Sequence, residues 1–247
     1  MFTDIDDTLS THGRITGEAY AAMARLRSAG MLVIPITGRP AGWCDHIARM
    51  WPVDAVVGEN GAFYMTYDDR ARKLSKRYVV GEAERRAGRE RLASIAARIL
   101  HEVPGCAVAS DQAYRESDLA IDYCEDVVPL LQPDVDRIVA LMRAEGLTAR
   151  VSSVHVNGWF GEYDKLGMTR TLLREEFGVD LDERREDYVF VGDSPNDASM
   201  FDFFPNSVGV ANVRRLADRI ATPPKYVTLG EAGAGFAELA DCLLAAR

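Results

Sequence analysis

Short apolar runs alternate with longer amphipathic stretches over most of the chain. Residues 31–36 form an apolar run typical of a buried strand, and residues 15–29 before it carry apolar positions at helical spacing, with Gly30 as a stop. The same patterns predict strands at 54–57, 188–191, 207–210 and 226–227, and helices at 165–177 and 235–246. This alternation favours an α/β fold built on a doubly wound, Rossmann-like parallel sheet.

A different order of elements begins near residue 80, after a hairpin predicted from residues 63–65 and 77–79. The patterns predict helices at 82–101 and 133–145, and strands at 106–110, 118–123, 148–155 and 159–160. This is the order α-β-β, repeated. We therefore expect an inserted α+β domain at residues 80–162, and a core made of residues 1–79 and 163–247.

Composition limits the partners of the chain. The 247 residues carry a formal charge of −9, which leaves no excess of Lys or Arg to neutralise nucleic acid or an anionic membrane. No apolar run approaches the roughly 20 residues of a membrane span, and no basic segment followed by an apolar run begins the chain. The four cysteines form no Cys-x-x-Cys pair, which argues against a zinc knuckle or a redox motif. We expect a cytoplasmic protein, monomeric or homodimeric.

Candidate chemistry begins at the acidic turn that follows the first apolar residues. If a strand ends at Asp4, Asp6 can swing back over the same point, and two carboxylates that share one small volume favour a divalent cation between them. A helix N-cap cluster at residues 6–8 is the alternative. A calcium loop is excluded, because Leu9 and Ile15 stand where it needs Gly and Glu. A phosphoryl-transfer nucleophile with an acid/base partner is the third interpretation.

A polar residue comes directly after three of the predicted strands. These residues are Asp4, Thr37 and Asp193. Ligands of an open parallel sheet bind beyond the carboxyl ends of its strands. Each residue also has a structural explanation. Residues 194–197 make a good helix start, Thr37 is suited to capping its helix, and an isolated Lys165 is usually a solvated surface residue.

The order of these residues along the chain favours a catalytic role over the structural explanations. The series is Asp4-x-Asp6-x-Thr8, then Thr37, then Lys165, then Gly192-Asp193 with Asp197. It resembles the four motifs of the haloacid dehalogenase superfamily of phosphohydrolases over the whole chain, and the insert resembles their type IIB cap. Gly192 to Asp197 and Arg115-Glu116 are most similar to the branch of mannosyl-3-phosphoglycerate phosphatase and sucrose phosphatase. Only Met1, Phe2 and Thr3 precede the first Asp, so we expect a short first strand, which leaves open a start inside a longer chain.

The resemblance implies a role for each motif residue. Asp4 would be the nucleophile, Asp6 the general acid/base, and Thr37 and Lys165 would hold phosphoryl oxygens. The implied cofactor is Mg²⁺. Its candidate site comprises Asp4, the backbone carbonyl of Asp6, Asp193, and Asp197 as an orienting residue.

We expect residues of the cap and of the core loops to bind the substrate and to determine which substrate is accepted. In the cap, Arg115 has a planar fork suited to a carboxylate or a second phosphate, with His155 and Asn157 as further candidates, although His155 also fits a structural role. The candidates on the core are Thr37, Gly38, Arg39, Asn60, Lys165 and Asn196.

The function implied is a magnesium-dependent phosphatase that acts on a small phosphorylated metabolite of the sugar phosphate or phosphoglycerate type. A sugar phosphomutase on the same scaffold is the alternative, because it also uses an aspartyl phosphate. A receiver-like signalling module is a third hypothesis, which the length of the chain and its large insert disfavour.

Overall fold

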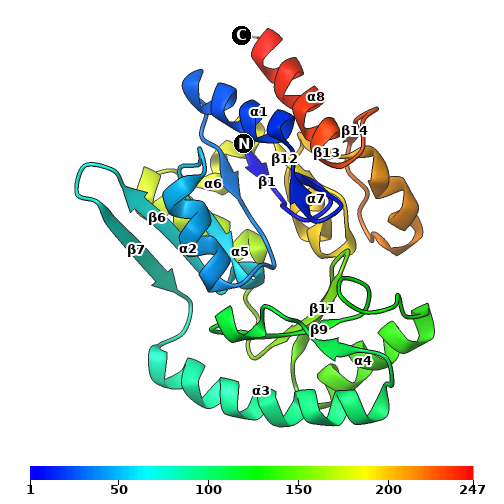
Figure 1. The fold of residues 1–247 in the computed structure, drawn as a ribbon. Helices are drawn as coiled ribbons and strands as arrows, with labels where there is room; N and C mark the ends of the chain where they lie inside the picture. The colour runs from blue at the N-terminus through cyan, green and yellow to red at the C-terminus, as the bar shows by residue number, and fades with distance from the viewer. Residues whose placement is uncertain (247) are drawn as a thin grey trace.

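A computed structural model describes residues 1–246, and a parallel sheet forms the centre of its larger part (Figure 1). Its strand order is β14-β13-β12-β1-β4, and every neighbouring pair is parallel. The strands are β1 (Phe2–Thr3), β4 (Ile34–Pro35), β12 (Phe190–Gly192), β13 (Ser207–Gly209) and β14 (Tyr226–Val227). A parallel bridge from Ile36 to Val57 reaches β5 (Val56–Gly58). The predicted parallel sheet is confirmed, and its first strand is short, as expected.

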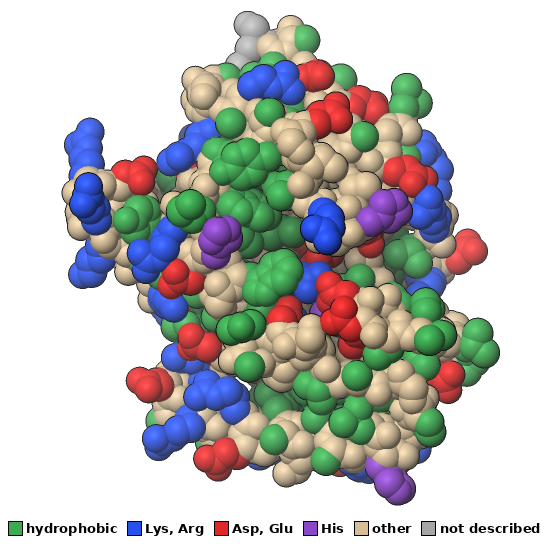
Figure 2. Space-filling view, in the orientation of Figure 1, with side chains coloured by type: hydrophobic (Ala, Val, Ile, Leu, Met, Phe, Trp, Pro, Cys, Tyr) green, Lys and Arg blue, Asp and Glu red, His purple; other side chains and the backbone are tan. Residues whose placement is uncertain are grey.

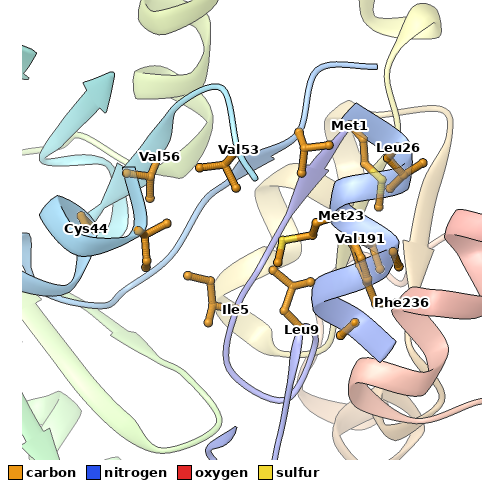
Figure 3. Packing of buried hydrophobic residues seen from close by; sticks show 14 of the residues in the cluster. Met1, Ile5, Leu9, Met23, Leu26, Cys44, Val53, Val56, Val191 and Phe236 are labelled. Carbon is orange, nitrogen blue, oxygen red and sulfur yellow. The ribbon is translucent and has the colours of Figure 1, made fainter. Parts of the chain in front are cut away.

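Helices cover both faces of this sheet. One hydrophobic cluster joins it to α1 (Gly17–Ser28), α2 (Ala41–Met50) and α8 (Ala232–Ala245). The other joins it to α5 (Lys165–Phe177), α6 (Leu181–Arg184) and α7 (Ala198–Phe203). Figure 3 shows Met23 and Phe236 in the first cluster, next to Val191. Phe190, which precedes Val191 in β12, belongs to the second cluster, because successive residues of a strand face opposite sides of the sheet. The sheet is therefore doubly wound.

Two hairpins extend the core. β6 (Phe63–Asp68) and β7 (Lys73–Tyr78) pair antiparallel and continue from β5, and both are longer than predicted. β2 (Ser10–Thr11) and β3 (Arg14–Ile15) form a hairpin after the acidic turn, with His12 at φ 50° and Gly13 at φ 71°. The expectation that a helix begins at residue 15 is wrong, because Thr16 caps α1 by accepting a hydrogen bond from the Ala19 amide.

The inserted elements form a separate layer below the central sheet in Figure 1. They form an antiparallel sheet in the order β10-β11-β9-β8, packed against α3 (Glu82–Glu102) and α4 (Gln132–Ala144). The strands are β8 (Ala107–Val108), β9 (Asp118–Asp122), β10 (Thr148–Val151) and β11 (His155–Trp159). The predicted α-β-β order is confirmed, but His155 begins β11 instead of ending the preceding strand. We call this layer the cap, and its elements lie within the proposed 80–162 insert.

Short 3-10 turns complete the described chain. They are η1 (Glu59–Gly61), η2 (Gln112–Tyr114), η3 (Arg185–Asp187), η4 (Pro195–Asp197) and η5 (Ala211–Arg219). Among the helices of residues 1–246, none has the length and apolar character needed to cross a membrane.

Candidate active site

Strand order brings Asp4, Thr37 and Asp193 to one edge of the sheet. β1 lies between β12 and β4, and the Asp4 amide donates to the Val191 carbonyl over 2.9 Å. On the other side, the Ile36 amide donates to the Thr3 carbonyl over 2.7 Å. Asp4 and Asp193 come directly after their strands, so their side chains meet beyond the carboxyl ends, as the sequence predicted.

Three buried carboxylates gather at this edge. Oxygen atoms of Asp4, Asp193 and Asp197 lie within 4.8 Å of one another, and all three residues are at most 4% exposed. The Lys165 ammonium donates to Asp4 Oδ1 and to Asp197 Oδ1, over 2.7 Å each. Residues separated by up to 193 positions in the sequence therefore form one compact charged group, which we call the carboxylate cluster.

The fold positions both Lys165 and Asp197 through helix starts. Asp164 caps α5 by accepting from the Gly167 amide over 2.7 Å, which leaves Lys165 in the first turn. Gly61, at φ 106°, packs against this cap so closely that a Cβ atom would lie 2.0 Å from the Asp164 carbonyl oxygen. Asp197 belongs to a capping box with Ser194 and accepts from the Asp193 amide over 3.1 Å. The same geometry of residues 194–197 therefore begins a helix and holds Asp197 at the carboxylate cluster.

The electrostatics of the carboxylate cluster favour a bound cation. Burial raises the pKa of Asp4 to about 8, although Lys165 lowers it, and Asp197 and Asp6 raise it further. Burial, with Asp4 and Asp197, likewise raises the pKa of Asp193 well above its usual range. Burial lowers the pKa of Lys165, but Asp197 and Asp4 outweigh this and raise it. Three carboxylates facing one ammonium are the oxygen-rich, electron-rich environment that fits Mg²⁺.

Asp193 has two further partners that the sequence analysis did not single out as site residues. Thr8 Oγ1 donates to Asp193 Oδ1 over 3.3 Å, and Asn212 Nδ2 donates to Asp193 Oδ2 over 3.3 Å. Asn212 also donates to the Asp7 carbonyl over 2.9 Å, so it ties the acidic turn to Asp193. Asn212 follows β13, and the rule that located Asp193 at a strand end points to it as well.

Asp6 is not one of the three clustered carboxylates, and its side chain pairs with Arg39. Arg39 donates to both of its oxygens, with Nε at 2.9 and 3.0 Å and Nη2 at 2.7 Å. The shared cation site of Asp4 and Asp6 stays a prediction, because in this structure a fork-shaped guanidinium is the partner of Asp6. The same guanidinium binds Glu125 of the cap and lies 4.5 Å from the centre of the Trp43 ring.

Thr37, Gly38 and Asn60 lie together beside the strand ends. Thr37 is fully buried, and its hydroxyl accepts from the Arg39 amide over 3.0 Å. Asn60 is 2% exposed, at φ 55°, and both side-chain polar atoms lack a hydrogen-bond partner. Those atoms lie 3.2 Å from the position of a Cβ at Gly38. A buried amide without a partner is costly, and it fits a site that a polar ligand completes.

Protein groups surround the Arg115 guanidinium on most sides. Nη1 donates to Asp118 over 3.0 and 3.1 Å and to the Gly38 carbonyl over 2.8 Å, and Nε donates to Asp111 over 3.2 Å. Asn157 Nδ2 also donates to Asp118, over 3.0 Å. Arg115 thus lies at the contact between cap and core with Nη1 and Nε engaged, and Asn157 binds Asp118 within the cap. Their roles in substrate binding stay predictions.

Two other predicted residues also contact protein groups. His155 Nε2 lies 2.8 Å from a Glu125 oxygen, which connects the cap to Arg39. Burial raises the pKa of Glu125, but its partners His155 and Arg39 outweigh burial and lower this pKa to about 2. Asn196 Oδ1 accepts from the Ser194 hydroxyl over 2.7 Å, beside the carboxylate cluster.

Of the cavities between cap and core, two are lined by residues of the acidic turn, Asp6 and Asp7. One of about 330 Å³ extends from Asp7 and Asp193 to Tyr123 and Ser153 of the cap. Another, of about 220 Å³, is lined by Asp6, Arg39 and Glu125 among others. Figure 2 shows acidic side chains next to a basic one along this seam. A ligand that reaches the carboxylate cluster is therefore in contact with both parts of the molecule.

Comparison with known proteins agrees with this geometry. Residues 1–84 match a family model described as haloacid dehalogenase-like hydrolase. No curated protein sequence matches the chain. The resemblance predicted from the motifs is confirmed, and it supports the expectation that the chain is an enzyme of the hydrolase class.

Solved structures extend the likeness over the whole chain. A protein from Thermoplasma acidophilum has a TM-score of 0.71 at 17% identity, over 98% of this chain and 96% of that one. Sucrose-phosphatase from Synechocystis, solved with sucrose and phosphate, has a TM-score of 0.65 at 16% identity, over 98% and 96%. A haloacid dehalogenase subclass IIB sugar phosphatase has a TM-score of 0.63 at 14% identity, over 98% and 97%. At these identities the likeness shows the fold alone: a parallel-sheet core with an inserted cap.

Proposed function

We propose that this protein is a magnesium-dependent phosphatase that hydrolyses a small phosphorylated metabolite through an aspartyl phosphate on Asp4. One observation carries the proposal: Lys165 bridges Asp4 and Asp197 beside Asp193, at the carboxyl ends of parallel strands. This arrangement offers a nucleophilic oxygen, a positive charge for the phosphoryl group and an oxygen-rich place for a cation.

The reaction proceeds in two displacements. A carboxylate oxygen of Asp4 forms a bond to phosphorus while the bond from phosphorus to the alcohol oxygen breaks, and Asp6 gives its proton to the departing alkoxide. Asp6 then takes a proton from a water molecule, whose oxygen attacks the phosphorus. The bond between phosphorus and Asp4 breaks, which releases inorganic phosphate, restores the Asp4 carboxylate and leaves Asp6 protonated, as at the start.

Substrate binding requires a rearrangement at Asp6. Arg39 occupies both oxygens of this carboxylate, and the alcohol oxygen of a substrate needs one of them. Arg39 therefore releases Asp6 and stays with Glu125 before the first step. The pair between Arg39 and Asp6 belongs to the form without substrate.

Magnesium would be held by a carboxylate oxygen of Asp4, by the backbone carbonyl of Asp6 and by Asp193, with Asp197 orienting this group through the Asp193 amide. When bound, it supplies positive charge that offsets the phosphoryl oxygens. Lys165 adds a second positive charge, and Thr37 and Asn60 offer polar groups from the opposite side, where Asn60 has two unpartnered atoms. The protein therefore neutralises the phosphoryl group from several directions.

Among the substrate classes considered, the contacts of the cap favour a sugar phosphate. A phosphoglycerate or a second phosphate needs a free guanidinium, but Arg115 is already bound by Asp111 and Asp118. Arg39 is bound by Glu125 and Asp6. Hydroxyl groups of a sugar are able to donate to Asp6 and Glu125, the more exposed of these carboxylates, without adding a charge.

A panel of phosphate esters tests the proposal by release of inorganic phosphate with magnesium present. We expect turnover of at least one sugar phosphate, and loss of turnover in Asp4→Asn, while the exposed control Asp241→Asn keeps it. Absence of turnover of every ester, or unchanged turnover in Asp4→Asn, would remove the proposal. A requirement for a bisphosphate activator, with an isomeric sugar phosphate exceeding free phosphate, would indicate the phosphomutase instead.

A further inference from the structure

Asn212 connects three segments that are far apart in the sequence. Its Nδ2 group donates to the Asp7 carbonyl over 2.9 Å and to Asp193 Oδ2 over 3.3 Å, and its Oδ1 atom accepts from the Ala232 amide over 2.9 Å. These partners lie in the acidic turn, directly after β12 and at the start of α8. One half-buried side chain therefore joins the turn that carries Asp6 to a carboxylate of the cluster.

The partners of Asn212 determine how its amide group is oriented. The Asp7 carbonyl can only accept a hydrogen bond and the Ala232 amide can only donate one, so the nitrogen faces the acidic turn and Asp193. Both bound backbone groups belong to residues in a left-handed conformation, at φ 53° for Asp7 and φ 48° for Ala232. Residues other than glycine seldom adopt this conformation. Asn212 thus holds two unfavourable backbone conformations in place beside the carboxylate cluster.

The Asp193 carboxylate accepts hydrogen bonds from neutral donors. Asn212 donates to one of its oxygens and the Thr8 hydroxyl to the other, over 3.3 Å each. Among the ion pairs of residues 1–246, none includes Asp193, although Lys165 pairs with both other members of the carboxylate cluster. Asp193 is only 2% exposed. Neutral donors orient this carboxylate but leave its buried charge without a counter-charge, which a divalent cation would supply.

We propose that Asn212 is a positioning residue for the magnesium site, an inference that rests on the proposed phosphatase function. Asp193 and the backbone carbonyl of Asp6 are two of the groups that would hold the ion. Asn212 binds the carboxylate of the first and the Asp7 carbonyl, which directly follows the second. It therefore sets the spacing of two ligands before the ion binds. Groups that orient metal ligands typically change metal affinity by about 10- to 100-fold.

Calorimetric titration of the intact chain with magnesium chloride, without substrate, tests the proposal. Asn212→Leu keeps the approximate size of the side chain but removes the amide group, and we expect magnesium to bind at least about tenfold more weakly. The smaller variant Asn212→Ala introduces no bulk and should show the same loss.

Asn206 provides the matched control. Its Nδ2 group also donates to a backbone carbonyl, that of Glu186, over 2.8 Å. Asn206 precedes β13, whereas Asn212 follows it, so Asn206 lies at the end of the strand that is remote from the carboxylate cluster. Asn206→Leu should leave the Kd of magnesium unchanged.

Thermal unfolding in chelator separates positioning from a purely structural role. Both leucine variants remove a hydrogen-bonded amide group, so both should lower the Tm in the absence of magnesium. Only the Asn212 variants should also raise the Kd of magnesium. In phosphate release from a sugar phosphate, they should raise the magnesium concentration needed for half-maximal rate, while the substrate KM at saturating magnesium stays near that of wild type.

The outcomes distinguish this inference from the proposed function. The inference is overturned if both Asn212 variants bind magnesium with the wild-type Kd, or if Asn206→Leu weakens binding equally. The phosphatase function stands in either case, provided that wild type releases phosphate and Asp4→Asn does not. A wild-type protein that neither binds magnesium nor releases phosphate would remove the proposed function and this inference together.

Discussion

The Glu59 carboxylate reaches from the core to the cap and accepts a hydrogen bond of 2.6 Å from the Ser117 amide. Its other oxygen accepts from the Glu116 amide over 2.9 Å and from the Ala41 amide over 3.0 Å. Glu59 is fully buried and has φ 44°, so the turn η1 directs its side chain at these three donors. One carboxylate therefore links the start of α2 to the cap.

Replacing Glu59 by Gln should loosen the contact between cap and core. Either oxygen of a carboxyl group accepts hydrogen bonds in both protonation states, but the nitrogen of a glutamine amide accepts none, so at least one of the three backbone N–H groups loses its partner. We expect the free energy of unfolding to fall by about 1–3 kcal/mol. Hydrogen exchange at the Glu116 and Ser117 amides should become faster than in the exposed control Glu84→Gln. Unchanged exchange in Glu59→Gln would contradict the role of this contact.

The same carboxyl group should make stability depend on pH. Burial, and then Asp118, raise the pKa of Glu59 from 4.5 to about 8, against the effects of Arg115 and the backbone donors. Between these values the folded protein holds a proton that the unfolded chain has lost, so stability falls as pH rises. The slope is at most about 1.4 kcal/mol per pH unit. Urea unfolding from pH 5 to pH 8 should therefore show a steeper decline for wild type than for Glu59→Gln, and equal slopes would contradict this.

Arg115 should matter first for stability. Arg115→Met leaves Asp118 buried without its counter-charge and Asp111 with Arg39 alone, and we expect the free energy of unfolding to fall by about 3–5 kcal/mol in urea titrations. The exposed control Arg86→Met should change it little. If stability is retained and only the KM of substrates with a second anionic group rises, Arg115 acts on the substrate instead.

Much of the fold follows from local signals. The sequence predicts both ends of the helix at 165–177, with Gly178 as its stop. In the structure Gly178 takes a left-handed conformation at φ 65° and ends the helix there. The meeting of Asp4 with Asp193 was predicted from strand ends, a rule that needs only the order of parallel strands. Thr16 was not recognised as the cap of α1, so the hairpin β2–β3 was partly assigned to a helix.

The partners of the charged residues were beyond sequence analysis. Arg39 binds Asp6, 33 residues away, and Glu125, 86 residues away in the cap. No local pattern specifies such contacts, because they depend on how the cap is placed on the core. Arg115 illustrates the same limit: its fork suits an anion of a substrate, but the carboxylates of Asp111 and Asp118 already satisfy most of it.

Magnesium should stabilise the protein through Asp193. A ligand at about 100 times its Kd adds about 2.7 kcal/mol, which corresponds to roughly 5–10 °C in Tm for a chain of this length. Thermal unfolding with magnesium or with chelator should show this shift in wild type and in the exposed control Asp241→Asn, and lose it in Asp193→Asn. Without magnesium, Asp193→Asn should unfold at or above the wild-type Tm, because one buried carboxylate fewer repels its neighbours. A retained shift in Asp193→Asn would contradict the site.

The most direct measurement is mass spectrometry of the peptide that contains Asp4, after rapid quenching of Asp6→Asn mixed with magnesium and 4-nitrophenyl phosphate, once wild type is shown to turn this ester over. Its phenolate leaving group departs without a proton, so the first displacement does not depend on Asp6. Asparagine at position 6 is unable to take a proton from water, so the second displacement slows and a phosphoryl group should be found on Asp4. An unmodified Asp4 peptide, or a phosphoryl group on another residue, would contradict a reaction that passes through this carboxylate.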